Sequence, residues 1–367
     1  MKILFLSSYD DRYLNFFYKN NKQLQTASFN EQLQAIYHDS YAWADGFKLA
    51  LQEKGVQSSD IVVNARYMQL SWARERKLKN FSAHSIVLNQ ICEYSPDVLF
   101  FNCYDTSLLA SIKADIKSIK LLIGHSGSAI VNREIFDRFD LVISCAPEVV
   151  CKLKDEGINA EQLHHAFDPR IKNRVSSDIG HDDFKEDIIF IGQIVPGKQF
   201  HNIRNDFLKE MSQSCDLSIY CSNLSETNLL KLCLQRSLVN YFSLKRNLKN
   251  GVFGLDMYRT IGNAKIVLNV HADSSFQFAS NMRLFETTGM GACLLTDWKE
   301  NINDLFIDGK ECITYKSAQD AVEKASWLLK HPDICKEIAK SGQEKTLQSH
   351  TFEHRTDELL QIIARNL

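Results

Sequence analysis

The stretch ASNMRLFETTGMGACLLTD, Ala279 to Asp297, combines a polar entry, an amphipathic run, two glycines and an apolar run. Ser280 or Asn281 can cap the free amides at the start of a helix. Gly289 and Gly291 then allow that helix to end and the chain to return tightly into a strand. A helix followed this closely by an apolar strand predicts a unit of a parallel α/β sheet.

Short apolar runs alternate with amphipathic stretches along the rest of the chain in the same way. This alternation is the pattern of parallel sheets covered by helices, so we predict two doubly wound, Rossmann-like α/β domains. The predicted strands are Lys2–Leu6, Val62–Ala65, Asp97–Asn102, Lys120–Ile123 and Asp140–Ser144 in the first half, and Asp187–Ile191, Asp216–Cys221, Leu238–Phe242, Lys265–Val270, Ala292–Thr296 and Cys312–Tyr315 in the second.

The length of 367 residues also favours two domains, because single cores rarely grow past roughly 250–300 residues. Hydrophobic periodicity lapses between His164 and Asp187, which places the join there. We expect one domain at 1–170, a second at 171–355, and a terminal helix at 356–367. Ligands of open α/β sheets bind outside the carboxyl ends of the strands, so two such domains are expected to face each other across a cleft.

The composition excludes several classes of function. A net charge of −2 provides no positive field for nucleic acid or an anionic membrane, so at most peripheral membrane contact is expected. The apolar run in the opening MKILFLSSYDD is too short for the core of a signal peptide. We therefore expect a cytoplasmic protein. The 10 cysteines form no C-x-x-C pair, so free thiols are expected and a zinc site is not.

The residue pair Arg283 and Glu286 is the first candidate for binding chemistry. The amino end of a helix favours a phosphate, and Arg283 in its first turn can add a charge-assisted hydrogen bond. Glu286 follows about 4.5 Å further along the same face, which is about the offset between a nucleotide's diphosphate and its ribose hydroxyls. An equally good interpretation is an i,i+3 ion pair on the surface of an amphipathic helix.

The stretch KIVLNVHADSSFQFASNMRLFETTGMGACLLTDWKENINDLFIDGKECITYKS resembles the carboxyl-terminal domain of GT-B glycosyltransferases, and within them the CgeB-like, spore-maturation type. The supporting matches are Asn269 and His271 after an apolar strand, and Asn281-x-Arg283-x-x-Glu286. DLVISCAPEVVCKLKDEGINAEQLHHAFDP and DIIFIGQIVPGKQFHNIRNDFL are similar to the end of the first domain and the opening of the second in this family. The resemblance therefore covers nearly the whole chain.

This resemblance implies an acceptor-side first domain, a donor-binding second domain and a terminal helix that returns to the first. It further implies contacts to the donor diphosphate near Gly192, Asn281 and Arg283, with Glu286 on the nucleotide ribose. Many retaining GT-B transferases carry another glutamate eight residues before this one, where the present chain has Phe278. Contacts to the donor sugar therefore do not carry over from that motif.

Three further residues are candidates for contacts with the substrates. His125 stands just past a predicted strand end, where related GT-B enzymes place a histidine close to the donor sugar. A near-neutral pKa would suit either a sugar contact or a proton carrier, while the alternative is a histidine held within a loop. Asn269 and His271 are possible donor contacts, although capping of a loop explains His271 equally well.

We therefore expect a metal-independent glycosyltransferase that moves a sugar from a nucleoside-diphosphate sugar to a hydroxyl of a carbohydrate, glycolipid or protein, in cell-surface glycan biosynthesis. No Asp-x-Asp pair is visible at a strand end, and the glycines of GMGA do not follow the dinucleotide fingerprint, so neither a metal nor another cofactor is expected. Two alternatives remain: a sugar-nucleotide epimerase of the same fold, and a catalytically silent subunit that binds a nucleotide sugar.

Overall fold

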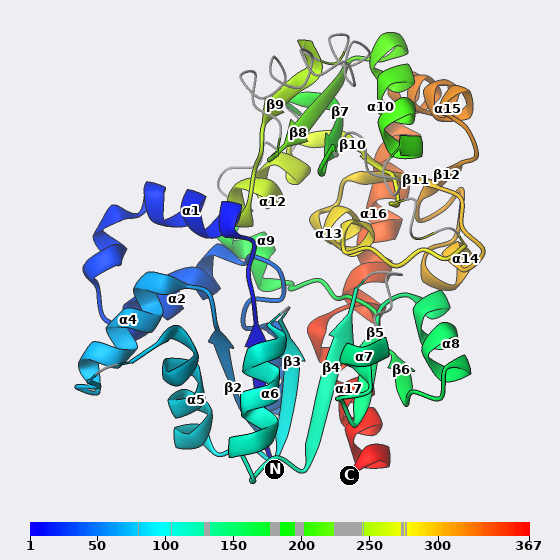
Figure 1. Cartoon of the computed structure of the whole chain (residues 1–367). Coiled ribbons are helices and arrows are strands. Elements are labelled where there is room, and N and C mark those ends of the chain that lie inside the picture. The colour runs from blue at the N-terminus through cyan, green and yellow to red at the C-terminus, as the bar shows by residue number, and fades with distance from the viewer. Residues whose placement is uncertain are drawn as a thin grey trace. The chain divides into compact units, whose positions relative to one another are not determined.

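The computed structural model describes residues 1–79, 81–103, 105–127, 133–176, 184–194, 202–223, 244, 246–272, 275 and 277–367. The chain forms two compact units, Met1–His164 with Phe352–Leu367, and His165–Thr351. Each unit contains a parallel sheet flanked by helices (Figure 1). This architecture confirms the predicted α/β fold class with two doubly wound sheets.

The sheet of the first unit has six parallel strands within the described residues, in the order β2-β1-β3-β4-β5-β6. The direction of strand addition reverses at β1, since β2 is added on one side of β1 and β3 on the other. Doubly wound sheets bind ligands at such a switch point, outside the carboxyl ends of the strands. The strands are β1 (Lys2–Ser7), β2 (Gln57–Val62), β3 (Val98–Asn102), β4 (Leu121–Ser126), β5 (Leu141–Ser144) and β6 (Ala160–Gln162).

Helices cover both faces of this sheet. Alternate residues of the strands, such as Leu4 and Leu6, join a buried cluster with apolar residues of α5 and α6. Phe5 points to the opposite face and stacks on Phe47 of α3, with 5.6 Å between ring centroids. The helices are α1 (Asp11–Asn20), η1 (Lys22–Thr26), α2 (Phe29–Asp39), α3 (Gly46–Glu53), α4 (Arg66–Glu75), α5 (Ala83–Tyr94), α6 (Thr106–Asp115), α7 (Arg133–Phe136) and α8 (Pro147–Asp155).

The terminal helix α17 (Phe352–Asn366) belongs to the first unit although it follows the second in sequence. Its first residue, Phe352, packs edge-on against Phe47 with 5.1 Å between ring centroids. Asp357 forms an ion pair with Lys54 at 2.7 Å, and the side chain of Asn366 accepts a hydrogen bond from Asn159 at 2.8 Å. The helix therefore begins at Phe352, earlier than the start at residue 356 that was predicted from the sequence.

The sheet of the second unit also has six parallel strands within the described residues, in the order β12-β11-β10-β7-β8-β9. Ile188, Val267 and their neighbours alternate between two buried clusters, one against α10, α15 and α16 and the other against α9, α12, α13 and α14. The strands are β7 (Glu186–Ile191), β8 (Leu217–Cys221), β9 (Leu248–Asn250), β10 (Ala264–Asn269), β11 (Cys293–Asp297) and β12 (Ile313–Tyr315), and the helices are α9 (Arg170–Val175), α10 (Asn202–Ser214), α12 (Gly254–Gly262), α13 (Arg283–Met290), α14 (Ile302–Leu305), α15 (Ala318–Lys330) and α16 (Pro332–Ser349).

Most predicted strands match the observed ones to within a few residues, but two differences matter. The strand predicted at Val62–Ala65 is observed earlier, at Gln57–Val62, and the residues after Val62 lead into α4. The three-residue strands β6 and β9 were not expected, since their burial depends on a partner strand rather than on their own composition. The strand predicted at Leu238–Phe242 lies outside the described residues.

The opening stretch folds as helix and strand, with two corrections. Met282 occupies the N-cap of α13 and provides no side-chain hydrogen bond, so neither Ser280 nor Asn281 caps the helix. Gly291 ends the helix with a left-handed φ of 80°, as predicted. Gly289 lies inside the helix instead, where a Cβ would come within 2.3 Å of the Phe167 ring. Close packing therefore explains this glycine.

The nine cysteines that the structure describes are all free thiols. No helix in the described part of the chain has the length and apolar character needed to cross a membrane.

Candidate functional site

The candidate site of the second unit lies at the carboxyl edge of its sheet. The chain winds from β7 out to β9 and then returns to β10, so the switch point falls between β7 and β10 (Figure 1). Gly192 follows β7 directly, and Asn269 is the last residue of β10. Helix α13 begins near the same edge, because the loop that follows β10 leads into it. The switch point therefore gathers residues that are distant in sequence.

Gly192 is held closely by its neighbours at this point. Its amide donates a hydrogen bond to the carbonyl of Tyr220 at 3.1 Å, and a Cβ would lie 2.6 Å from the Phe190 ring. The amide is thus already used by the sheet. Gly192 therefore leaves the end of β7 without a side chain at the switch point. Its own N–H is not available to a phosphate in this structure.

Asn269 and Asn281 are joined across the loop between β10 and α13. The Asn281 side-chain amide donates to Asn269 Oδ1 at 2.7 Å, and the Asn269 amide donates to Thr296 Oγ1 at 2.9 Å. The hydroxyl of Tyr315 donates to the Asn269 carbonyl at 2.7 Å. Asn281 Oδ1 is buried and has no hydrogen-bond partner among the residues that the structure describes. An unpaired buried acceptor is costly, so it points to a donor group on a ligand.

The amino end of α13 presents the predicted Arg283 and Glu286 together. Arg283 Nη1 lies 2.8 Å from Glu286 Oε2, and both side chains are largely buried, with 16% and 7% exposed. The pair is therefore not the surface ion pair of the alternative interpretation. Arg283 also points Nη1 at the sulfur of Met257, at 3.2 Å, while its Nε is buried without a partner within the described residues. The guanidinium keeps one donor available for an additional acceptor.

Tyr258 completes this arrangement from α12. Its hydroxyl donates to Glu286 Oε1 at 3.4 Å, a long hydrogen bond. Burial, and then the negative charge of Glu286, raise the pKa of Tyr258 well above its usual value, so the phenol keeps its proton. Tyr258 was not predicted as a site residue, because its contact spans 28 residues of sequence.

His271 has a structural role that involves Asp297. The His271 Nδ1 lies 2.6 Å from Asp297 Oδ1, which also accepts the His271 amide at 3.1 Å. The Ser280 amide donates to His271 Nε2 at 3.4 Å, so Nδ1 carries the proton toward Asp297. The histidine is fully enclosed and braces the loop that carries Asn281. The capping interpretation of His271 thus agrees with its geometry better than a donor contact does.

Asp297 stands at the end of β11 as a partly buried carboxylate, with 20% of its side chain exposed. Burial raises its pKa, but the contacts with His271 and Lys299 outweigh burial and hold the pKa of Asp297 at about 2. Lys299 Nζ lies 3.3 Å from Asp297 Oδ2 and donates to the Ser275 carbonyl at 2.6 Å. The pairing keeps Asp297 ionised at neutral pH and fixes the strand end against the loop.

His125 lies at the carboxyl edge of the other sheet, in the first unit. It is the penultimate residue of β4 rather than a residue beyond it. Its Nδ1 lies 3.1 Å from Asn102 Oδ1 at the end of β3, and Trp43 meets its ring edge-on with 5.1 Å between centroids. Burial lowers the pKa of His125 to about 4, so the expectation of a near-neutral pKa is wrong. The imidazole is neutral at pH 7.

Asn102 and Trp43 are two residues that sequence reasoning missed. A donor proton on His125 Nδ1 matches the Asn102 oxygen, which leaves Nε2 as an acceptor. The only sequence signal for Asn102 is a polar residue directly after an apolar strand, at the edge where ligands of such sheets bind. Trp43 belongs to a stretch rich in aromatic residues, for which core packing was the preferred interpretation, and its approach to His125 depends on the path of the chain before α3.

The comparison with known families concerns the second unit. Residues 204–361 match the family model described as "Glycosyl transferase-like". The whole chain has a GT-B fold, and this region of it resembles glycosyltransferases in sequence. The matched region includes α13 and therefore Arg283 and Glu286, and it extends into α17. No curated protein is significantly similar to the chain in sequence.

Solved structures resemble the fold of this chain over its full length. HepE from Anabaena in complex with UDP-glucose matches with a TM-score of 0.58 at 14% identity, covering 100% of both chains. Sucrose-phosphate synthase from Thermosynechococcus elongatus matches with a TM-score of 0.59 at 10% identity, covering 100% of this chain and 98% of that one. A glycosyltransferase from Rickettsia africae matches with a TM-score of 0.55 at 9% identity, covering 100% of this chain and 98% of that one. At these identities the likeness shows the fold alone.

Proposed function

We propose that the protein transfers a sugar from a nucleoside-diphosphate sugar to a hydroxyl group of an acceptor. The observation that carries this proposal is the buried pair of Arg283 and Glu286 at the amino end of α13, beside the unpaired oxygen of Asn281. A buried guanidinium with a spare donor suits a diphosphate, and a buried carboxylate suits a pair of ribose hydroxyls. Both lie at the switch point of the sheet, where nucleotides bind in this fold class.

Catalysis would depend on stabilising the departing diphosphate. Helix α13 begins with the amides of Arg283 and Leu284, to which the N-cap residue Met282 provides no side-chain hydrogen bond, whereas the amide of Phe285 already donates to the Met282 carbonyl at 3.0 Å. The first two amides and the Arg283 guanidinium direct partial and full positive charge at one place, where negative charge develops as the bond to the sugar breaks. We propose that this replaces a divalent cation. Turnover should therefore survive EDTA, and a complete loss that Mn²⁺ or Mg²⁺ restores would contradict the mechanism.

His125 is proposed as a contact to the donor sugar. A base with a pKa of about 4 takes up a proton poorly at neutral pH, so the low pKa favours the sugar contact over the proton carrier. With Nδ1 directed at Asn102, the neutral ring offers Nε2 as an acceptor for a sugar hydroxyl. The proton of the acceptor hydroxyl would then need a different base.

The acceptor class remains as predicted: a carbohydrate, glycolipid or protein hydroxyl in cell-surface glycan biosynthesis, within the CgeB-like type of glycosyltransferase. The solved complexes of HepE with UDP-glucose and with UDP support a uridine nucleotide as the first donor to test. A thermal-shift screen of UDP, GDP, CMP and ADP sugars tests the donor site. Ligand at 100 times its Kd adds about 2.7 kcal/mol of stability, which is a readily measured shift.

Release of free nucleotide separates the candidate functions once a donor is known. A transferase releases nucleoside diphosphate in proportion to the acceptor added. An epimerase converts the donor with no acceptor present, and a silent subunit, which Phe278 in place of a glutamate suggests, binds the donor without releasing nucleotide. Absence of binding to every nucleotide sugar would overturn the proposal.

A further inference from the structure

The side-chain amide of Asn281 has an oxygen and a nitrogen, and only one of them faces a ligand. In the structure the nitrogen donates to Asn269 Oδ1 at 2.7 Å, and Asn281 Oδ1 is buried with no hydrogen-bond partner among the described residues. The oxygen and nitrogen of an amide are told apart by the contacts that each makes. The polarity of the contacts behind Asn281 therefore decides what kind of ligand group it can bind.

These contacts form a chain of hydrogen bonds that begins at Asp297. Its neighbours outweigh burial and hold the pKa of Asp297 at about 2, so at neutral pH the carboxylate only accepts hydrogen bonds. The hydroxyl of Thr296 donates to Asp297 Oδ1 over a long 3.4 Å. Its oxygen then accepts from the side-chain amide of Asn269 at 2.9 Å, which turns Asn269 Oδ1 toward Asn281. Asn281 consequently presents its oxygen, an acceptor, to a ligand.

A diphosphate does not match this oxygen. Its charged oxygens accept hydrogen bonds and donate none, so an amide oxygen directed at them is repelled. The expected contact between the Asn281 side chain and the donor diphosphate therefore disagrees with the polarity of these hydrogen bonds. An unpaired buried acceptor is satisfied instead by an O–H or N–H group. The ligand group opposite Asn281 Oδ1 is thus a hydrogen-bond donor.

The order of three side chains indicates which part of the donor supplies that group. Asn281 precedes α13, Arg283 is the first residue of the helix, and Glu286 lies one turn further. Under the proposed function Arg283 holds the diphosphate and Glu286 holds the ribose. In a nucleoside-diphosphate sugar the diphosphate separates the sugar from the ribose and the base. The acceptor that precedes Arg283 therefore faces the sugar, whose hydroxyls are hydrogen-bond donors.

We propose that Asn281 Oδ1 accepts a hydrogen bond from a hydroxyl of the transferred sugar, and that Asn281 thereby selects donors that carry this hydroxyl. The inference rests on the proposed function, because it assigns a further role within the same donor site. A site built to bind a substrate hydroxyl discriminates against analogues that lack it, since its own polar group is then left unpaired. Asn281 is therefore a specificity-determining residue for the sugar.

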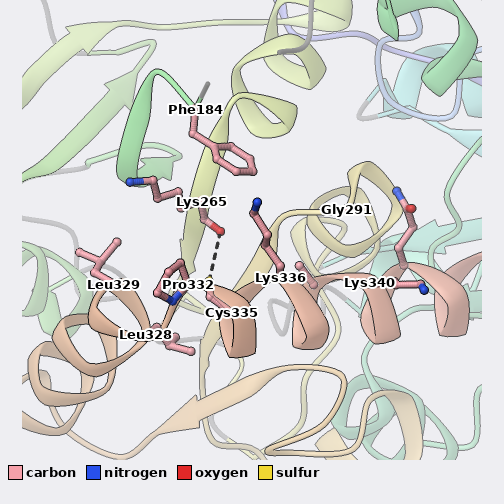
Figure 2. Close-up of a pocket in the computed structure, with 11 residues that line it drawn as sticks. Phe184, Lys265, Gly291, Leu328, Leu329, Pro332, Cys335, Lys336 and Lys340 are labelled. Atoms are coloured by element: carbon pink, nitrogen blue, oxygen red, sulfur yellow. Dashed lines mark hydrogen bonds between the residues drawn. The ribbon is translucent and has the colours of Figure 1, made fainter. Parts of the chain in front are cut away.

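A cavity at the amino edge of the same sheet provides a control position. It encloses about 320 Å³, and Lys265, Phe184 and Leu328 are among its lining residues (Figure 2). Lys265 is the second residue of β10, whereas Asn269 ends that strand beside Asn281. Four residues of strand span about 13 Å, so a ligand bound by Asn281 does not contact Lys265. Lys265→Met keeps the length of the side chain and alters only the cavity.

Calorimetric titration of the full chain with UDP and with UDP-glucose measures the contribution of the sugar separately. Asn281→Ala removes one hydrogen bond to the sugar and none to the nucleotide. It should therefore weaken UDP-glucose by about three- to tenfold and UDP by less than about twofold. Lys265→Met should change neither affinity. If the screen of nucleotide sugars identifies a different donor, that donor and its nucleoside diphosphate replace this pair.

Deoxyfluoro analogues of UDP-glucose identify the hydroxyl. Each analogue carries fluorine, which donates no hydrogen bond, in place of one sugar hydroxyl. The analogue that lacks the hydroxyl bound by Asn281 should bind the wild type about three- to tenfold more weakly than UDP-glucose. It should lose nothing further in Asn281→Ala, because both changes remove the same hydrogen bond. Analogues altered at other hydroxyls should still lose affinity in that variant.

The outcomes separate this inference from the proposed function. Equal weakening of UDP and UDP-glucose in Asn281→Ala, with an unchanged melting curve, assigns the side chain to the diphosphate and overturns the inference alone. Unchanged affinity for both ligands has the same consequence. The inference also fails if every analogue binds the wild type as tightly as UDP-glucose, or if Lys265→Met loses UDP-glucose binding. Failure of the wild type to bind any nucleotide sugar overturns the proposed function itself.

Discussion

The guanidinium of Arg283 lies 2.8 Å from the carboxylate of Glu286, one turn along α13, and both groups are largely removed from solvent. A buried ion pair is a poor source of net stability, because its desolvation cost rivals its attraction. Its value here is that it holds both groups in position before a ligand arrives. Arg283 also has a hydrogen-bond donor left for a ligand, since its Nε has no partner within the described residues.

Glu286 provides the first prediction. Loss of a carboxylate that accepts both ribose hydroxyls removes charge-assisted hydrogen bonds worth about 1.5–3 kcal/mol each. Glu286→Ala should therefore weaken nucleoside diphosphate roughly ten- to a hundredfold, about 1.4–2.8 kcal/mol, and Glu286→Gln less. Calorimetric titration measures both. If Glu286→Ala is folded and binds like wild type, Glu286 does not hold the ribose.

Arg283→Ala distinguishes the two halves of the nucleotide. It should weaken nucleoside diphosphate much more than free nucleoside, because Arg283 is assigned to the diphosphate. Removing one partner of a buried ion pair also destabilises a protein by about 3–5 kcal/mol, so melting curves must accompany the titrations. An equal loss for nucleoside and nucleoside diphosphate would move Arg283 away from the diphosphate.

The pH dependence of turnover tests His125. Burial lowers its pKa to about 4, so the imidazole stays neutral from pH 5 to 8 and contributes no inflection to kcat in that range. His125→Ala should lower kcat strongly and leave nucleoside diphosphate affinity nearly unchanged. Near-wild-type turnover of this variant would limit His125 to a structural role.

Asn102→Asp provides the complementary test. A carboxylate beside Nδ1 favours the imidazolium and raises the pKa of His125. Activity should then fall as pH drops below the raised pKa, because protonation removes the acceptor at Nε2. A kcat profile of Asn102→Asp identical to wild type between pH 5 and 8 would contradict the proposed role of this contact.

Asp297 should make the free energy of unfolding depend on pH in the acidic range. Its folded pKa of about 2 lies below the usual 3.8, so its contribution is complete above about pH 4 and is lost as pH falls to 2. The difference corresponds to about 2 kcal/mol. Asp297→Asn should be less stable than wild type in urea at pH 6, and the gap should narrow toward pH 2. A gap independent of pH would show that the charge is not responsible.

The terminal helix should be needed for the stability of the first unit. Leu359, Ile362 and Ile363 are buried on α17, and each buried aliphatic side chain contributes about 1.5–3 kcal/mol. Deleting Thr356 to Leu367 should lower the melting temperature and impair activity. Deleting Leu367 alone, which is 60% exposed, is the matched control and should change neither. Identical melting curves for both deletions would show that the helix is dispensable.

The local parts of this structure could be predicted from the sequence. Strand and helix periodicity is a property of neighbouring residues, so the α/β class and most strand centres within the described residues were correct, and so was the left-handed end of α13 at Gly291. The spacing of Arg283 and Glu286 on one helix face is equally local. The three-residue strands β6 and β9 were not predicted, because each contains a single apolar residue and therefore shows no apolar run.

The sequence by itself thus determined the two α/β halves, the helix with its terminal glycine, and the spacing of one candidate pair. Only the tertiary structure decided what surrounds that pair: the hydroxyl of Tyr258 on Glu286, Asn269 on Asn281, and Asp297 on His271. It also decided that His125 is neutral at pH 7, since a pKa follows from burial and neighbouring charges. The reason is the same throughout. These contacts join residues from different strands and helices, and the order of strands in a sheet is set by packing over long separations rather than by the residues next in sequence.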